Sequence, residues 1–456
     1  MRTPLDIDPY PGKPKILFVG YAVSTHTRSW IDLLDESELN VRLFALPSAP
    51  NVPPENWKVR TYITDYISLK LDPHTRASLY PSLAGQVERL TQKRYARRLR
   101  LYSHIRPLYQ KLRPLYNRHF VRRLLGGVRS PEEWLAQIIR QWQPDIIHTL
   151  GLDPASYFYY QVRNRFKLAG IGKWVLQLRG GSDLTLTRLD PDESPKIAQV
   201  LRACDQLLSD NEQNFSFASE MGVREEQISA LGAVPGTGGI DVASLVRSWH
   251  GPPSSRRIIL WPRAYESPWS KALPVLEAIK MSWDQIQPCE IYILAMNQDT
   301  NQDETRLWYL TLPERIRQFC HTEDRIPRDK VLQLMVQSRV MLSPSLIDGT
   351  PNTMWEAMAA GALPIVSPLE TIRPVAEHER NVLFARNLYP HEIAEALRRA
   401  MCDDALVDGA AKRNLEVVRR RADRSKIGPR VVEYYEGLAK EQRQEAIIVH
   451  ETKATA

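Results

Sequence analysis

The chain has 456 residues, of which 43% are hydrophobic and 25% are charged, and its formal net charge is +8. This composition is typical of a globular protein with two or three domains, each long enough to bury a core, and it excludes a fibrous or wholly disordered chain. The sequence has no apolar run as long as a membrane span, no signal-peptide core and no Cys-x-x-Cys pair, so we expect a reduced, cytoplasmic protein.

The first half of the chain alternates short apolar runs with segments that suit helices. The predicted strands are 15–20, 41–46, 144–148, 174–178 and 206–209, and the predicted helices are 28–34, 132–141 and 211–221. This succession of strands and helices indicates a Rossmann-like domain. We place the domain at 15–240, after an N-terminal tail at 1–14 and with a basic helical insertion at 89–129.

Three loops in this first domain follow predicted strands and carry polar or flexible residues. His26 lies in the loop after the first strand, and His148 ends a later strand. Arg179 and Gly180 open a loop that contains a pair of glycines, which would let a ligand approach the backbone closely. Structural roles stay open for all three loops, namely a histidine at a helix start, a histidine at a strand end and a plain tight turn.

The second half repeats the same rhythm after a stretch that is dense in glycine and proline. We place the hinge between Pro235 and Arg257 and assign 241–257 to the segment between the domains. The predicted strands are 258–261, 291–295, 340–342, 364–366 and 381–385, and the predicted helices are 272–280, 327–338, 351–360, 390–402 and 411–440. We place a second Rossmann-like domain at 258–420. The segment 421–456 is predicted to be a helix and a tail, disordered after Ala446.

The most informative stretch runs from Val340 to Pro368, where a short strand leads through a loop into a helix. Thr350 is predicted to cap this helix, Pro351 to be its first residue and Gly361 to end it. The start of such a helix offers unpaired N–H groups and a partial positive charge, both of which suit a phosphate.

Two carboxylates flank this helix start. Asp348 precedes the helix, and Glu356 is about its sixth residue, roughly 8 Å further along the axis. This separation is too large for two acids that share one proton, and it fits one extended ligand held at two places. We expect a sugar by the loop, phosphates at the helix end and a ribose diol beside Glu356, because carboxylates commonly hold ribose hydroxyls.

Three segments of this stretch together resemble a known motif: Asp-Gly-Thr-Pro-Asn at 348–352, Glu-Ala-Met-Ala at 356–359 and Gly-Ala-Leu-Pro-Ile-Val at 361–366. They resemble the donor site of retaining, nucleotide-sugar-dependent glycosyltransferases of the GT-B fold, the large family of glycosyl transferases group 1. In that family two acids are separated by seven residues, and Asp348 stands here for the commoner glutamate. The resemblance implies an α/β chain with two Rossmann-like domains that face a cleft. It also implies a last helix that crosses back to the first domain.

The resemblance further implies the residues of the site. Arg263 and Lys271 match the cations that hold the donor diphosphate, although the loop between them is longer than usual, and with Asp348 they form the implied catalytic set. The implied substrate-binding residues are His26, His148, Arg179, Gly180, Gly349, Thr350, Pro351, Asn352, Thr353 and Glu356. The chain departs from the family at Leu150 and Arg179, where histidines are common.

A member of this family moves a hexosyl or N-acetylhexosaminyl group from a nucleoside-diphosphate sugar to a hydroxyl of a glycan or lipid-linked acceptor, with retention of configuration. Polysaccharide or cell-envelope biosynthesis is the implied setting. We expect no cofactor and no metal, since Asp190-Pro-Asp192 and Asp6-Ile-Asp8 match a metal motif formally but neither follows a long apolar strand. Two other classes stay open: a GT-B-type nucleotide-sugar epimerase, and a non-catalytic protein that binds a sugar nucleotide or polysaccharide.

The positive charge is concentrated in the stretch 89–129, which contains 13 Lys and Arg and no acid. Subtracting these 13 charges from the net charge of +8 leaves −5 for the remainder of the chain. Tyr and Leu interleave with Arg at roughly helical spacing, which suits an anionic membrane surface, nucleic acid or a solvated helix. We favour the inner face of the cell membrane, because many relatives use lipid-linked acceptors, and we expect no nucleic-acid partner.

We expect the purified protein to co-sediment with anionic vesicles at low salt and to leave them at high salt, since ions screen surface charge. Replacement of Arg94, Arg97, Arg98 and Arg100 by Gln is expected to abolish sedimentation while the melting temperature stays unchanged. Continued sedimentation of this variant, or a preference of the wild type for RNA over vesicles, would contradict the membrane interpretation.

Overall fold

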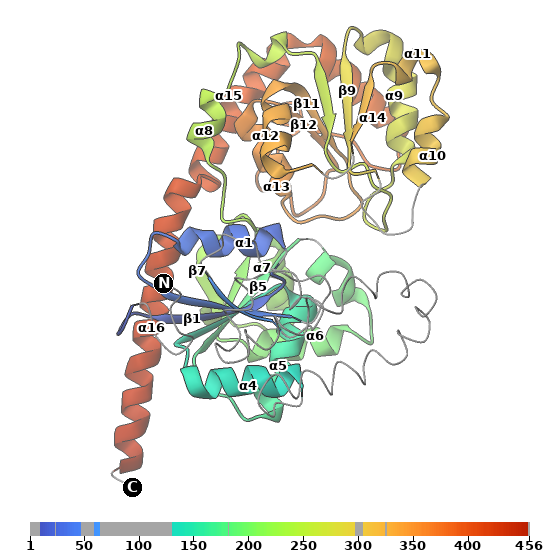
Figure 1. Cartoon of the computed structure of the whole chain (residues 1–456). Coiled ribbons are helices and arrows are strands. Elements are labelled where there is room, and N and C mark those ends of the chain that lie inside the picture. The colour runs from blue at the N-terminus through green and yellow to red at the C-terminus, as the bar shows by residue number, and fades with distance from the viewer. Residues whose placement is uncertain are drawn as a thin grey trace, which may run out of the picture.

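The computed structural model describes residues 10–22, 24–46, 59–63, 130–180, 182–296, 304–323 and 326–454. The basic stretch 89–129, Gly181 and the first nine residues lie outside the described residues, so their predictions stay predictions. The described residues form two α/β domains, shown one above the other in Figure 1, with a long final helix beside the lower, N-terminal domain.

The N-terminal domain is built on a seven-stranded parallel sheet with the order β3-β2-β1-β4-β5-β6-β7. Its strands are β1 (Lys15–Gly20), β2 (Asn40–Ala45), β3 (Arg60–Ile63), β4 (Ile146–Leu150), β5 (Lys173–Leu178), β6 (Gln206–Ser209) and β7 (Ile228–Ala233). Its helices are α1 (Thr25–Ile31), α4 (Pro131–Trp142), α5 (Tyr157–Arg165), α6 (Ser194–Ala203) and α7 (Glu212–Glu220). The predicted elements are present with small shifts at their ends, and β3, β7, α5 and α6 are additional to the prediction.

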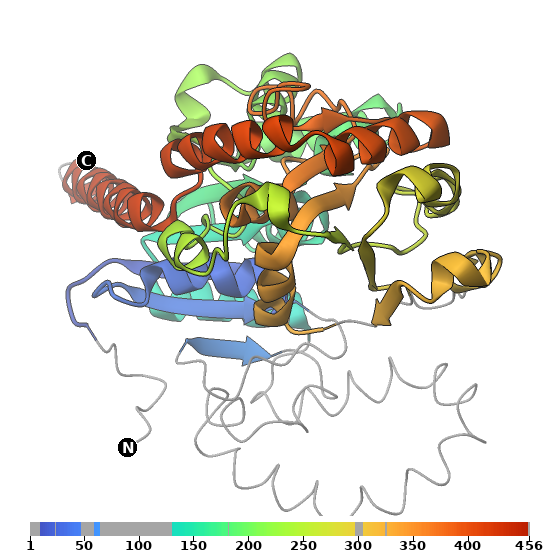
Figure 2. The ribbon, with the colours of Figure 1, turned by 90° about the horizontal axis from the view of Figure 1, so that it is seen from above.

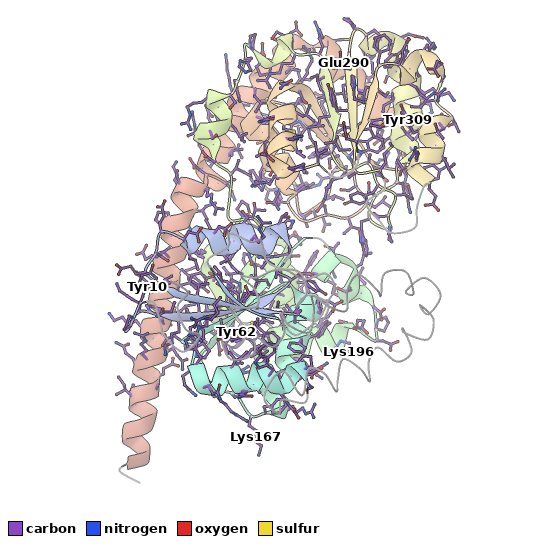
Figure 3. All side chains as sticks on the ribbon, viewed as in Figure 1. Tyr10, Tyr62, Lys167, Lys196, Glu290 and Tyr309 are labelled. Carbon is purple, nitrogen blue, oxygen red and sulfur yellow. The ribbon has the colours of Figure 1, made fainter. Side chains whose placement is uncertain are left out.

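Helices cover both faces of this sheet, which explains why its strands are apolar at nearly every position. Because side chains alternate along a strand, Ile16 and Phe18 of β1 lie on one face and Leu17 and Val19 on the other. The first face packs against α1 and the last helix α16 (Arg424–Ala454), and the second packs against α4, α5, α6 and α7. Side chains fill the layers between the sheet and its helices (Figure 3).

The C-terminal domain has a six-stranded parallel sheet with the order β10-β9-β8-β11-β12-β13. Its strands are β8 (Ile258–Trp261), β9 (Glu290–Leu294), β10 (Cys320–Glu323), β11 (Ser338–Ser343), β12 (Leu363–Val366) and β13 (Leu383–Phe384). Its helices are α8 (Val242–Arg247), α9 (Leu273–Ile286), α10 (Glu304–Leu310), α11 (Glu314–Arg317), α12 (Arg328–Gln337), α13 (Asn352–Ala360), α14 (Pro390–Cys402) and α15 (Asp404–Arg421). Helices α9 and α14 pack on one face, and α8, α12 and α13 pack on the other, while α15 contributes side chains to the clusters on both sides.

The chain passes between the domains twice, and the two passages lie side by side. The amide of Ile240 donates to the carbonyl of Ala422 (2.7 Å), and the amide of Arg424 donates to the carbonyl of Ile240 (2.9 Å). The first passage therefore lies at 235–240, within the hinge predicted between Pro235 and Arg257, whereas the part at 241–257 packs within the C-terminal domain from α8 onward. After the second passage α16 runs along the N-terminal domain, as Figures 1 and 2 show, which confirms the expected return of the last helix.

Tyr435 anchors α16 to the N-terminal sheet. Its hydroxyl accepts a hydrogen bond from Trp30 Nε1 (2.9 Å) and lies 2.6 Å from Nδ1 of His148. All three side chains are completely buried. Burial lowers the pKa of His148 well below its ordinary value and raises the pKa of Tyr435, so both groups stay neutral in the core.

Two predicted helix starts are wrong, each for a local reason. Helix α1 begins earlier than predicted, at Thr25, because the hydroxyl of Ser24 caps it by accepting from an amide of the first turn. Helix α13 begins at Asn352, because Pro351 keeps an extended backbone and acts as the cap. Thr350 therefore lies one residue before the cap rather than at it.

The C-terminal segment also differs from its prediction. The single helix predicted at 411–440 is two helices, α15 and α16, that meet at the second passage between the domains. The tail expected to be disordered after Ala446 continues α16 to Ala454. None of the helices in the described part of the chain, α16 included, is both long and apolar enough to cross a bilayer.

Candidate functional site

The loop between β11 and α13 brings the start of a helix to the junction of the two domains. Pro351 has an extended backbone (φ −62°, ψ 132°), and the helix begins at Asn352. Thr371 holds this loop from behind: its hydroxyl donates to the carbonyl of Asp348 (2.8 Å), and its carbonyl accepts from the hydroxyl of Thr350 (2.9 Å). The first turn of α13 is therefore held in place with its unpaired amides and partial positive charge.

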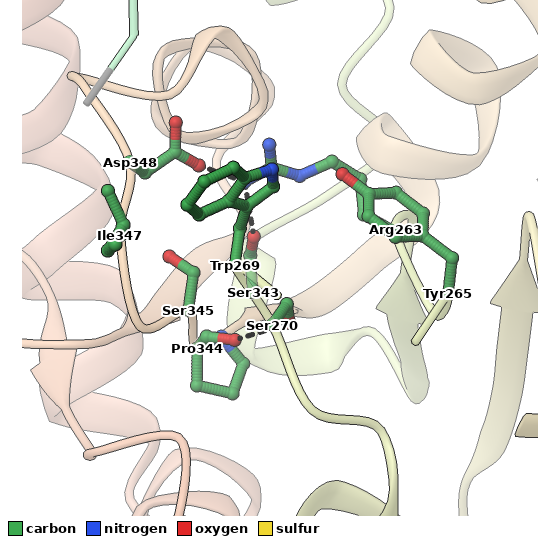
Figure 4. A pocket seen from close by; sticks show the side chains of 9 residues that line it. All are labelled: Arg263, Tyr265, Trp269, Ser270, Ser343, Pro344, Ser345, Ile347 and Asp348. Carbon is green, nitrogen blue, oxygen red and sulfur yellow. Dashed lines mark hydrogen bonds and ion pairs between the residues drawn. The ribbon is translucent and has the colours of Figure 1, made fainter. Parts of the chain in front are cut away.

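Arg263 and Asp348, both predicted catalytic residues, meet in a small pocket of the C-terminal domain. Arg263 lies just after β8 and forms an ion pair with Asp348, and its Nη2 also donates to the hydroxyl of Ser343 (3.3 Å). Tyr265 and Trp269 line the same pocket (Figure 4). The Trp269 side chain is 41% exposed, although its carbonyl accepts from an amide of the Asp348 loop (2.7 Å). The pocket thus offers a cation, a carboxylate and an exposed aromatic ring held on a fixed backbone.

Lys271 does not line this pocket. Its Nζ forms an ion pair with Glu266 Oε1 (2.7 Å). Its amide donates to Asn387 Oδ1 (2.9 Å), and its carbonyl accepts from Asn387 Nδ2 (3.0 Å). The extra length of this loop is taken up by a turn in which Ser267 and Ser270 hydrogen-bond to each other through their backbones. The structure therefore does not bring Lys271 together with Arg263 and Asp348.

Glu356 is the fifth residue of α13 and is held by Arg328, the first residue of α12. Its Oε1 accepts from Nε (2.8 Å) and Nη2 (2.7 Å) of Arg328. Burial raises the pKa of Glu356, while the Arg328 guanidinium acts in the opposite direction and favours the carboxylate. Among the described residues, Oε2 of Glu356 has no hydrogen-bond donor, so one carboxylate oxygen is available to a ligand.

In the N-terminal domain, the loop after β5 is held by two carboxylates. Asp183 accepts the amide of Arg179 (2.8 Å), and Asp210, which follows β6, accepts the amide of Gly180 (2.8 Å). The guanidinium of Arg179 donates twice to Gln177 Oε1 (3.2 and 2.9 Å). Burial raises the pKa of Asp183 to about 7 and that of Asp210 to about 6, and burial lowers the pKa of Arg179 to about 10.

The two domains touch where this loop meets the Asp348 loop. A Cβ built on Gly349 would lie 2.8 Å from the Cα of Gly180 and 2.8 Å from Oδ2 of Asp210. Real Cβ atoms essentially never come this close to other atoms. Position 349 must therefore be glycine for the two loops to approach as they do.

Asn352 connects the domains through its side-chain amide. Its Oδ1 accepts from the hydroxyl of Thr237 (3.0 Å), in the first passage between the domains, and its Nδ2 lies 3.3 Å from Nδ1 of His26. If Nδ2 donates this bond, His26 Nδ1 is the acceptor and the ring proton lies on Nε2. The first residue of α13 thus contacts the second residue of α1.

The pKa of His26 indicates a cluster of positive charge at this junction. Desolvation, and after it nearby positive charge, lowers the pKa of His26 to about 4, although the residue is exposed on the protein surface. Three positive charges act in the same direction and come from Arg179, Arg263 and Arg328. Guanidinium groups that repel an imidazolium attract an anion, so this junction suits a phosphate or diphosphate.

His148, predicted as a substrate-binding residue, lies in the core instead. Its ring is completely buried, contacts Phe18 and Trp30, and hydrogen-bonds Tyr435. The structural alternative left open for this histidine is therefore the better description. Sequence reasoning could not see this, because the partner Tyr435 lies 287 residues away on a helix that returns from the other domain.

The structure thus brings most of the predicted site residues to the junction and keeps Lys271 and His148 from it. The hydroxyl of Thr353, in the first turn of α13, is buried without a hydrogen-bond partner in the described structure.

Sequence reasoning missed Arg328, Trp269 and Asp210. Trp269 could have been noticed as an aromatic residue in an overlong loop and Asp210 as an acid after a strand, whereas no local signal marks Arg328.

Comparison with known proteins supports this description. Residues 257–403 match the family described as glycosyl transferases group 1, and no curated protein matches the chain. Among solved structures, the chain is similar to the sucrose-phosphate synthase of Thermosynechococcus elongatus (TM-score 0.63, 14% identity, covering 93% of this chain and 99% of that one). It is also similar to the HepE protein of Anabaena in complex with UDP-glucose (0.61, 12%, 92% and 98%) and to a glycosyltransferase from Rickettsia africae (0.61, 13%, 94% and 99%). These findings confirm the predicted GT-B fold of two Rossmann-like domains and the family resemblance of the donor motif.

The imidazole of His26 is expected to titrate near pH 4 in the free protein, as measured by NMR, because desolvation and the three arginines disfavour its charged form. Inorganic pyrophosphate is expected to raise the pKa of His26, since its negative charge offsets the positive charge of the guanidinium groups. The variant His26→Gln identifies which signal in the spectrum belongs to His26. A midpoint near the ordinary 6.5, or one that pyrophosphate does not move, would contradict the cationic junction.

Proposed function

Because its C-terminal domain matches glycosyl transferases group 1 and the whole chain has the GT-B fold, we propose that this protein is a retaining glycosyltransferase. It moves a hexosyl or N-acetylhexosaminyl group from a nucleoside-diphosphate sugar to a hydroxyl of a glycan or lipid-linked acceptor. The observation that carries this proposal is the convergence of Arg263, Arg328 and the start of α13 beside two acids, Asp348 and Glu356. The UDP-glucose bound to the Anabaena structure supports a nucleotide-sugar donor.

The donor diphosphate binds between Arg263 and the first turn of α13. In the described structure Arg263 is paired with Asp348, so donor binding exchanges this pair for two new contacts. The guanidinium turns to the phosphates, and Asp348 accepts hydroxyls of the sugar. Trp269, exposed in the same pocket, offers its apolar face to the sugar ring.

The ribose diol binds to Glu356. Arg328 occupies only Oε1 of this carboxylate, and Oε2 has no donor among the described residues, so Oε2 accepts the ribose hydroxyls. Arg328 keeps the buried carboxylate charged, which strengthens these hydrogen bonds.

Transfer with retention proceeds without a protein nucleophile. The aspartates at the junction are engaged elsewhere: Asp183 and Asp210 hold backbone amides, and Asp348, released from Arg263 by the donor, accepts sugar hydroxyls. We therefore assign deprotonation of the incoming hydroxyl to the leaving phosphate on the same face of the sugar. The protein stabilises the charge that grows on the diphosphate through Arg263 and the helix start, with no metal ion required.

Replacement of Arg263 by Ala is expected to lower turnover by about a hundredfold or more, because this cation stabilises charge that develops in the transition state. Donor affinity should fall by a smaller factor. Single-turnover transfer at saturating donor measures the effect, and Arg257→Ala, an exposed arginine at the start of the same strand, is the matched control. Lys271→Ala should be milder, since Lys271 is paired with Glu266. Near-wild-type rates for Arg263→Ala would show that the diphosphate does not bind to Arg263.

Replacement of Glu356 by Gln is expected to weaken donor binding by about 1–3 kcal/mol, because a charge-assisted hydrogen bond becomes a neutral one. The wild type should discriminate against a 2′-deoxyribose donor, and the variant should do so much less. Titration calorimetry with both donors measures this difference. Equal discrimination by the two proteins would show that Glu356 does not bind the ribose.

A further inference from the structure

We propose that a second cavity, separate from the donor site, binds a phosphate-bearing anion at the connection between the two domains. The cavity has a volume of about 380 Å³ and is lined by Arg420 and Arg421 at the end of α15, Arg430 of α16, Glu212 of α7 and part of β7. A volume of this order is within the range of small-molecule sites. None of the residues assigned to the donor site lines it.

The charge of this cavity is unbalanced. Three guanidinium groups line it, against the single carboxylate of Glu212, which pairs with Arg421. Nη2 of Arg430 donates to the carbonyl of Leu231 (3.0 Å), a neutral partner. The exposed guanidinium of Arg420 has no hydrogen bond or ion pair in the described structure. The cavity therefore carries two positive charges without a counter-charge.

The neighbouring basic residues are engaged elsewhere. Arg424 donates to the carbonyl of Ser29 (3.0 Å), and Lys426 donates to the carbonyl of Arg419 (2.9 Å). These two residues therefore contribute to the connection between the domains and to the end of α15. Arg420 and Arg430 differ from them because they face an open cavity.

Phosphate is the anion that this arrangement suits best. Planar guanidinium groups bind phosphate oxygens through two parallel hydrogen bonds, and several of them around one cavity match a group with several oxygens. The phosphate group can belong to a small soluble ester or to a lipid headgroup.

Such a ligand would connect the two domains. Arg420 and Arg421 belong to the C-terminal domain, whereas the β7 wall and Glu212 belong to the N-terminal domain. An anion bound to all three arginines holds these parts in the described arrangement, next to the second passage of the chain at Ala422. It thereby stabilises the domain arrangement from a position outside the donor site.

The test compares the full-length wild type with the double variant Arg420→Gln/Arg430→Gln. Calorimetry with inorganic pyrophosphate is expected to show two sites in the wild type, one at the donor site and one at this cavity. In the double variant, the affinity of the second site for pyrophosphate should fall by roughly tenfold or more, which is the size expected when charge-assisted contacts are lost. In the double variant, pyrophosphate should still raise the pKa of His26, because that change depends on binding at the donor site.

The matched control is Lys412→Gln/Arg419→Gln, which removes the same charge from exposed positions of α15 that do not line the cavity. Circular dichroism checks that both double variants are folded. Calorimetry with a water-soluble short-chain phosphatidic acid and with glycerol phosphate distinguishes the two sources. A site for a lipid headgroup binds the short-chain lipid more tightly than glycerol phosphate, and Arg420→Gln/Arg430→Gln removes this preference. A single pyrophosphate site in the wild type, or an equal loss in the control variant, would overturn the proposal.

Discussion

The structure depends on two passages of the chain that are hydrogen-bonded to each other between the domains. Ile240 in the first passage bonds both Ala422 and Arg424 in the second, so neither passage can move without the other. The second passage then enters α16, whose Tyr435 is buried against the N-terminal sheet. One compact connection therefore sets how the two sheets face each other.

The facing loops can approach closely because small residues lie between them. Gly349 leaves room for Gly180 and Asp210, and Asn352 reaches across to Thr237 in the first passage. The start of α13, which carries the donor motif, is thus in direct contact with the N-terminal domain. A change in the angle between the domains would break these contacts at the same time as it opened the site.

Positive charge is concentrated around this connection on two sides. At the donor site, each arginine has an acid partner: the half-buried Asp348 pairs with Arg263, and the buried Glu356 pairs with Arg328. At the α15–α16 junction, the carboxylate of Glu212 faces three arginines. A guanidinium with an acid partner needs no ligand in the resting protein, whereas an unpaired one in a cavity is stabilised by an external anion.

The sequence by itself determined the two domains of alternating strands and helices, the presence of a helix shortly after Asp348 and the spacing to Glu356, although it did not reveal β3, β7, α5 or α6. These features follow from periodicity, turn residues and motif spacing, which are local. Only the tertiary structure decided that Arg328 pairs with Glu356, 28 residues further along, and that Tyr435 covers His148 from 287 residues away. It also decided that Lys271 pairs with Glu266 rather than joining Arg263. The reason is physical: burial and ion pairing depend on which side chains the fold brings into contact, and residues far apart in the chain carry no spacing signal for that contact.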